Sequence, residues 1–157
     1  MDFYLWLEGQ TLSTWVRESP AIWGYPTILM LHTLGMAVLV GTSAVVSLRV
    51  IGVGRTIPLA PLRGLFPVVW AGGGLSFATG ALLFGADAST RGTQGLFFAK
   101  LAIVATGIVT VALTRRHVFG EIAEPAVVSQ TARRLAFVSL LAWVAAITAG
   151  RLLAYVE

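Results

Sequence analysis

The sequence predicts an all-α fold, a four-transmembrane-helix bundle with an N-terminal amphipathic helix at the membrane interface. Hydrophobic residues make up 57% of the 157 residues and charged residues only 11%. Soluble domains are about 45–50% apolar and about 25% charged, so a soluble globule of this composition would lack the charge to cover its surface. A membrane β-barrel alternates in hydropathy at every second residue, whereas the apolar runs here are uniform, which favours helices. We therefore expect one integral membrane domain over residues 1–157.

The N-terminal segment, residues 2–18, is expected to be an interfacial helix. It lacks the basic start of a secretory signal and carries Asp2 and Glu8 instead. Its four aromatic residues suit the membrane–water interface. Ser19–Pro20 should end it, because proline disfavours a helical residue before it. The alternative is a short surface helix that covers the end of the bundle.

Four stretches are long and uncharged enough to cross the hydrocarbon, which takes about 20 helical residues. They cover about residues 22–48, 64–86, 92–116 and 134–156. Lys100 interrupts the third stretch and Arg151 the fourth. Four spans place both termini on the same side of the membrane.

The loops on one side of the bundle are rich in arginine. The basic residues there are Arg49, Arg55, Arg63, Arg115, Arg116, Arg133 and Arg134, against the acidic Glu121 and Glu124. By the positive-inside rule these loops are cytoplasmic, which predicts a multi-pass protein of the bacterial inner membrane with both termini periplasmic. Because the arginines lie in short loops and form no basic stripe, nucleic-acid binding is not expected. The expected surroundings are the lipid bilayer.

Small and hydroxyl side chains recur at every fourth residue in three spans. The sets are Gly72, Ser76 and Gly80; Thr106, Thr110 and Thr114; and Ala142, Ala146 and Gly150. Such stripes let neighbouring helices approach closely, so we interpret them as packing surfaces, with a ligand groove as the alternative.

Three ionisable residues inside the spans are the candidate ligand-binding site. His32 lies about 13 Å, Lys100 about 12 Å and Arg151 about 8 Å from the outer ends of their predicted spans. Ionisable groups in hydrocarbon are costly, so their convergence at one depth suggests a polar site. Each has a simpler alternative. His32 can be hydrogen-bonded between helices, Lys100 can reach to the surface, and Arg151 can do the same or pair with Glu157 or Asp87.

The ligand of such a site stays open. His32 and Met36 are one helical turn apart, and imidazole with thioether suits Cu(I), so these two are the candidate metal ligands. A b-type haem on His32 would be five-coordinate, because the other histidine, His117, lies at the opposite end of its span and is expected to be an interfacial residue. An anionic or quinone headgroup could instead meet Lys100 and Arg151. The absence of cysteine excludes thiolate-bound iron–sulfur clusters and c-type haem.

Several segments, in order along the chain, resemble a family of uncharacterised bacterial four-helix membrane proteins known only as a domain of unknown function. They include YPTILMLHTLGMAVLVGTSAVVSLRVIG, WAGGGLSFATGALLF, FFAK and SLLAWVAAITAGRLLAY. The resemblance covers nearly the whole chain and implies the fold without an activity, and His32, Lys100 and Arg151 coincide with recurring polar positions of its pattern. The LH…G pattern of the first span is more distantly similar to copper-resistance D proteins and cytochrome-b-like bundles.

Three functions follow as hypotheses. The first is a small membrane binding subunit whose polar site in the outer half of the bilayer holds a metal, a haem or an anionic or quinone headgroup. The second is a structural accessory subunit of a larger, energy-transducing membrane complex, or a homo-oligomer packed through its small-residue faces. The third is a copper-handling permease. No catalytic motif was found, so an enzyme is not the expected class.

Overall fold

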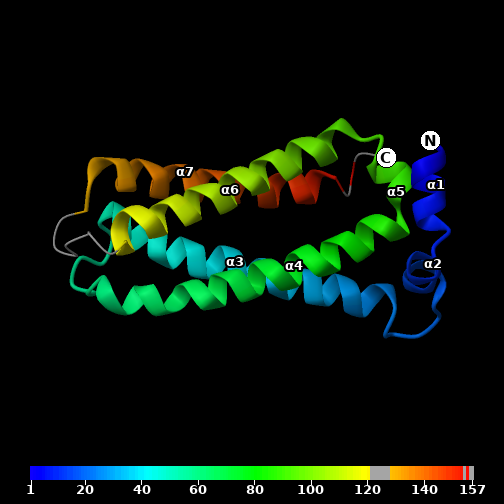
Figure 1. Cartoon of the computed structure of the whole chain (residues 1–157), viewed down its shortest axis with the longest axis horizontal. Helices are drawn as coiled ribbons and strands as arrows, with labels where there is room; N and C mark the ends of the chain where they lie inside the picture. The colour runs from blue at the N-terminus through cyan, green and yellow to red at the C-terminus, as the bar shows by residue number, and fades with distance from the viewer. Residues whose placement is uncertain (121–127, 154, 156–157) are drawn as a thin grey trace. The chain divides into compact units, whose positions relative to one another are not determined.

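Four helices dominate the computed structural model, which describes residues 1–120, 128–153 and 155 (Figure 1). Within these ranges the helices long and apolar enough to cross a membrane are α3 (Tyr25–Ile51), α4 (Phe66–Ala86) with the short 3-10 helix η1 (Ala60–Leu65) before it, α6 (Gly95–Phe119) and α7 (Gln130–Leu152). The predicted fold class, an all-α four-helix bundle, is confirmed, and the chain is a multi-pass membrane protein. Glu121, Glu124, Glu157 and the predicted end of the fourth span at residue 156 lie outside the described residues.

The helix ends differ from the predicted spans by up to four residues. The fourth span, expected at 134–156, is observed as Gln130–Leu152. Arg133, which the predicted spans left in a loop, belongs to α7, and Arg115, Arg116 and Arg134, which were counted with the loops at the very ends of their predicted spans, lie inside α6 and α7. Arginine is a good helix former, and its long side chain can reach water from the end of a span, so the helices continue through these charges.

The N-terminal segment forms two helices, α1 (Asp2–Glu8) and α2 (Thr11–Glu18), and the expected single helix over 2–18 is corrected accordingly. Gly9 ends α1, and Gln10 adopts an extended conformation as the N-cap of α2. Glycine weakens a helix interior, which explains a break at this point. As predicted, α2 stops at Ser19, which is extended before Pro20.

The chain divides into two compact units, each made of two stretches of sequence. The first comprises Met1–Leu39 and Trp70–Gly95, and so holds α1, α2, the first half of α3, most of α4 and the short α5 (Ala88–Arg91). The second comprises Val40–Val69 and Leu96–Glu157, with the rest of α3, η1, the start of α4, nearly all of α6 and α7.

In the first unit, α3 and α4 run antiparallel with their backbones in close contact. A Cβ atom on Gly35 would lie 2.7 Å from the backbone nitrogen of Ser76 and 2.9 Å from the carbonyl oxygen of Gly72. A Cβ atom on Gly72 would lie 2.8 Å from the backbone nitrogen of Leu39. Only glycine permits this approach, and the predicted packing role of Gly72 and Ser76 is confirmed.

The N-terminal helices pack at the end of α4 in the same unit. Figure 1 shows α1 beside α5. The ring of Tyr4 lies over Gly92, where an added Cβ atom would come within 2.6 Å of it, and Ser13 of α2 contacts Gly85. The aromatic side chains of Phe3, Trp6 and Trp15 remain exposed, as expected of residues at a membrane interface.

In the second unit, α6 and α7 run antiparallel in a register set by two glycines. Gly107 faces the indole of Trp143, and Gly150 faces the side chain of Lys100. Ala142 and Ala146 are buried, as the packing interpretation predicted. Thr110 and Thr114 are buried too, but Thr106 is exposed and its hydroxyl donates to the carbonyl of Ala102. Positions four apart drift by about 40° around a helix, so three of them do not share one narrow face.

Candidate functional site

Among the candidate site residues, His32 has the most fully defined side-chain contacts. It is the eighth residue of α3, about 10 Å along the helix, and it is half-buried. Its Nδ1 lies 2.9 Å from the carbonyl oxygen of Ser76 and 3.2 Å from Oγ1 of Thr79, both on α4. A carbonyl oxygen only accepts hydrogen bonds, so Nδ1 carries the proton and donates it to Ser76. In the neutral ring, Nε2 is then the nitrogen with the lone pair.

The imidazole is also held in place by its fit against α4. A Cβ atom on Gly80 would lie 3.0 Å from Cε1 of His32 and 3.3 Å from Nδ1, so the ring rests on a surface that a larger residue would obstruct. The hydroxyl of Thr79 donates to the carbonyl of Leu75 at 2.7 Å, which orients its oxygen to accept from the ring. His32 is therefore hydrogen-bonded between helices through its Nδ1 atom, as the simpler alternative of the sequence analysis expected.

Met36, the second candidate metal ligand, is half-buried one turn further along α3. Residues at this spacing lie on the same helix face, so Met36 and His32 share one face of α3. In the part of the chain that the structure describes, no three His, Cys, Asp or Glu residues form a group that could hold a metal ion. A metal here would therefore rely on the His32 imidazole and the Met36 thioether.

Lys100 and Arg151 belong to the second unit, whereas His32 belongs to the first. The Nζ atom of Lys100 would lie 3.6 Å from a Cβ atom on Gly150, so the ammonium is packed beside the residue that precedes Arg151. Both cations therefore occur at one end of the α6–α7 pair. The guanidinium of Arg151 lies 5.6 Å from the centre of the Tyr155 ring, a cation–π distance.

The depth of these two cations differs from the prediction. Lys100 is the sixth residue of α6, about 8 Å from its start. Arg151 is in the last turn of α7, because that helix begins and ends earlier than expected, and it is exposed. Asp87, one proposed partner of Arg151, forms an ion pair with Arg91 at 2.9 Å. His117 lies exposed in the last turn of α6, a position that suits an interfacial residue.

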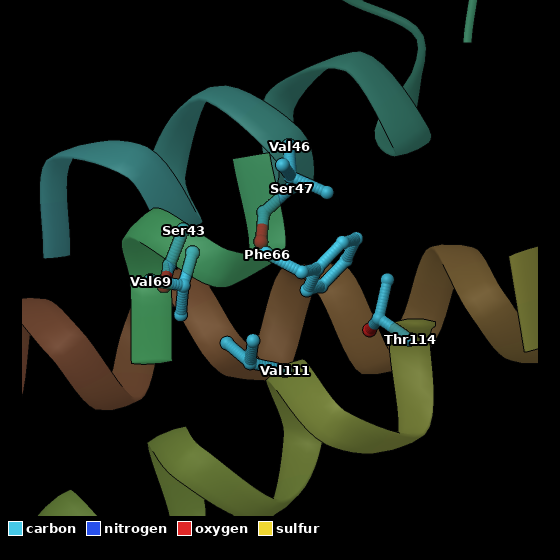
Figure 2. Close-up of a pocket in the computed structure, with 7 residues that line it drawn as sticks. All are labelled: Ser43, Val46, Ser47, Phe66, Val69, Val111 and Thr114. Carbon is cyan, nitrogen blue, oxygen red and sulfur yellow. The ribbon is translucent and has the colours of Figure 1, made fainter. Parts of the chain in front are cut away.

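Hydroxyl side chains of α3 and α6 also line one space in the interior of the second unit. Figure 2 shows Ser43 and Ser47 of α3 and Thr114 of α6 among the residues that line this space, together with Val69 and Phe66 of α4. The space among them has no room for a water molecule. The hydroxyl stripe of α6 is therefore a packing surface here, and the alternative of a ligand groove has no support at this point.

One carboxylate site escaped the sequence analysis. Glu8 of α1 accepts hydrogen bonds from the backbone nitrogen and the hydroxyl of Ser89, both at 2.7 Å, and Arg17 lies 3.9 Å away. The Ser89 hydrogen bonds, with help from the Arg17 charge, lower the pKa of Glu8 below its usual value and outweigh the opposing effect of burial. The two residues are 81 positions apart, so no local signal could have predicted the pair.

No protein-family model, curated protein or solved structure matches the chain.

Proposed function

We propose that this chain is a small integral membrane binding subunit in which His32 is the residue that meets the ligand. The observation that carries the proposal is the hydrogen bond from Nδ1 of His32 to the carbonyl oxygen of Ser76, at 2.9 Å. Histidines that bind metals usually donate their other ring nitrogen to a carbonyl or carboxylate, which fixes the tautomer and the ring orientation. The α4 backbone supplies that arrangement inside a span, where an ionisable residue is costly without a role.

The tautomer favours ligands that accept a lone pair from the ring or donate a hydrogen bond to it. A neutral ring with its proton on Nδ1 offers a lone pair at Nε2, which suits copper, haem iron or the hydroxyl of a reduced quinone headgroup. For a copper ion, the Met36 thioether on the same face of α3 is the proposed soft donor. The chain's other histidine, His117, lies in the last turn of α6, where it is expected at the interface, so a haem iron on His32 would be five-coordinate. For an anionic headgroup, Lys100 and Arg151 are the proposed cations.

A structural accessory subunit is the second candidate, and an exposed face of α4 favours it. Gly74 is exposed, and in the described part of the chain no heavy atom lies within 4 Å of a Cβ placed there. Ala78 and Ala81 are exposed on the same helix. Small residues on an outer face let another helix approach, so this face suits a second copy or a partner subunit. Stable co-purification with one partner, lost in Gly74→Leu, supports this role, and a monomer in mild detergent contradicts it.

The proposed location is the bacterial inner membrane, with both termini in the periplasm. The support is the charge distribution, with seven arginines on the opposite side against Glu121 and Glu124. The chain has no cysteine, so single cysteines introduced at Gln10 and at Ile57 would report the two sides by their reactivity in intact cells. Labelling of the Gln10 position alone supports the orientation, and labelling of the Ile57 position alone overturns it.

The binding proposal is tested by what purifies with the protein from its native membrane. An absorption spectrum, metal analysis and extraction of organic molecules should be compared for wild type, His32→Gln and His117→Gln. We expect one stoichiometric ligand in wild type and in His117→Gln, and its loss in His32→Gln with helicity retained. A copper signal that also requires Met36 identifies the soft-metal site. A ligand that both histidine variants retain, or no ligand in wild type, contradicts the proposal.

A further inference from the structure

An open pocket of about 630 Å³ lies in the second unit where α3 ends. Three of its lining residues are arginines, Arg49, Arg55 and Arg133. The others are apolar residues and a glycine, among them Val50 and Leu59, and the described lining includes no acidic side chain. Three positive charges around one space repel each other, so the pocket is suited to an anion.

The arginines are held in position by the loop between α3 and η1. Arg49 donates from Nε to the carbonyl of Ile57 and from Nη2 to the carbonyl of Arg55, the latter at 3.2 Å. The loop turns through Gly52 and Gly54, whose φ angles of 119° and 63° favour glycine. The Arg55 side chain folds back over Gly52, where an added Cβ atom would lie 3.3 Å from its Nε.

The third arginine comes from the start of α7. The backbone nitrogen of Arg133 donates to the carbonyl of Ser129, the N-cap residue, so Arg133 lies in the first turn of a 23-residue helix. The N-terminal end of a helix carries a partial positive charge, which adds to that of the guanidinium groups.

We infer that this pocket binds the phosphate group of an acidic phospholipid. Guanidinium groups match phosphate oxygens in geometry and charge, which accounts for the three arginines. The exposed apolar part of the lining, Pro58 and Ala60, would cover the glycerol and the first acyl carbons, which a free phosphate ion lacks. The lining residues lie at the ends of long apolar helices or in the chain segments directly next to those ends, which is the depth at which headgroups lie. This is also the side that the arginine distribution predicts to be cytoplasmic, where acidic lipids attract basic residues.

The test is lipid binding to the full chain in detergent, followed by native mass spectrometry. Phosphatidylglycerol and phosphatidylcholine of the same acyl chains are titrated separately, and phosphatidylglycerol again in the presence of inorganic phosphate. The double variant Arg55→Gln/Arg133→Gln is compared with Arg63→Gln/Arg134→Gln. The control pair removes the same charge from the same region but lies outside the pocket lining. Arg49 is left intact because its bonds shape the loop.

We expect one phosphatidylglycerol to bind in preference to phosphatidylcholine. The pocket variant should weaken it about fivefold for each arginine, or about 25-fold in all, and the control pair much less. Arg55→Lys/Arg133→Lys, which keeps the charge but loses the guanidinium geometry, should bind phosphatidylglycerol more tightly than the Gln pair and less tightly than wild type. Three results overturn the inference: no preference for the acidic lipid, an equal loss in the control pair, or displacement by millimolar phosphate, which would indicate a free-phosphate site.

Discussion

Replacement of Gly35 by alanine tests the close contact that places α4 beside His32. The new Cβ atom would lie 2.7 Å from the backbone nitrogen of Ser76 and 2.9 Å from the carbonyl oxygen of Gly72. Ordinary Cβ contacts begin at 3.4 Å, so the two backbones must separate by about 0.7 Å, which is 3.4 minus 2.7. Both obstructing atoms belong to the backbone of a helix and cannot rotate away.

The expected cost follows from this overlap. Overpacking of a close-packed site typically costs about 1–3 kcal/mol. Alanine for glycine in a helix interior contributes about 1 kcal/mol in the opposite direction. Gly41→Ala is the matched control on α3, because no heavy atom of the described chain lies within 4 Å of a Cβ placed there. The helix term is common to both variants, so their difference, about 1–3 kcal/mol, isolates the packing cost.

The free energy of unfolding is measured by titration with a denaturing detergent in mixed micelles, followed by tryptophan fluorescence. Gly35→Ala should be less stable than Gly41→Ala by the stated amount. The same separation could lengthen the contact between His32 and Ser76, now 2.9 Å, to as much as about 3.6 Å, beyond a hydrogen bond. Equal stability of the two variants would refute the close backbone contact between α3 and α4.

Two further predictions concern the ends of the helices. Because the pKa of Glu8 is lowered in the folded protein, its bonds to Ser89 stabilise the attachment of α1 above the usual carboxyl pKa and are lost as pH falls through the lowered value. Limited proteolysis of the first 18 residues should therefore increase in acid for wild type and change little with pH in Glu8→Gln; parallel pH profiles would argue against this attachment. Ser129 accepts a hydrogen bond from the backbone nitrogen of Ala132 as the N-cap of α7. Ser129→Ala should lower the unfolding free energy by about 1 kcal/mol and Ser129→Asp should not, whereas identical losses would exclude a capping role.

Hydropathy located the four spans because a helix in lipid satisfies its own backbone, so apolar composition and length suffice. The ends of the helices were less predictable. Arg133 was predicted to lie in the loop before the fourth span, yet α7 already begins at Gln130, because an arginine side chain can reach water from a helix end. Because α7 ends at Leu152 and the predicted span ended at residue 156, Arg151 lies in the last turn and not inside the span. The break between α1 and α2 depends on Gly9 alone, a weak helix former. The charged and aromatic residues from which a single helix over 2–18 was predicted do not indicate this break.

The candidate site was predictable in part. His32 stands out because a polar residue in a span needs a partner, but the identity of that partner depends on the register of α3 against α4. Gly35 and Gly72 set this register, because the backbones of α3 and α4 approach closely at these two residues. Neither glycine alone indicates in the sequence which residue of the other helix it faces. The arginines of the pocket were interpreted only as topology signals. Their grouping depends on a loop shaped by the positive φ angles of Gly52 and Gly54.

The most direct test of the binding proposal is the protonation state of His32 in a bilayer. Solid-state ¹⁵N NMR of histidine-labelled protein, assigned with His32→Gln, distinguishes the two ring nitrogens. A coupling between Nδ1 and the Ser76 carbonyl carbon reports their contact. The account predicts a neutral ring with the proton on Nδ1, in contact with Ser76, and Nε2 without a proton. A proton on Nε2 in a neutral ring, or no contact between Nδ1 and Ser76, would contradict it.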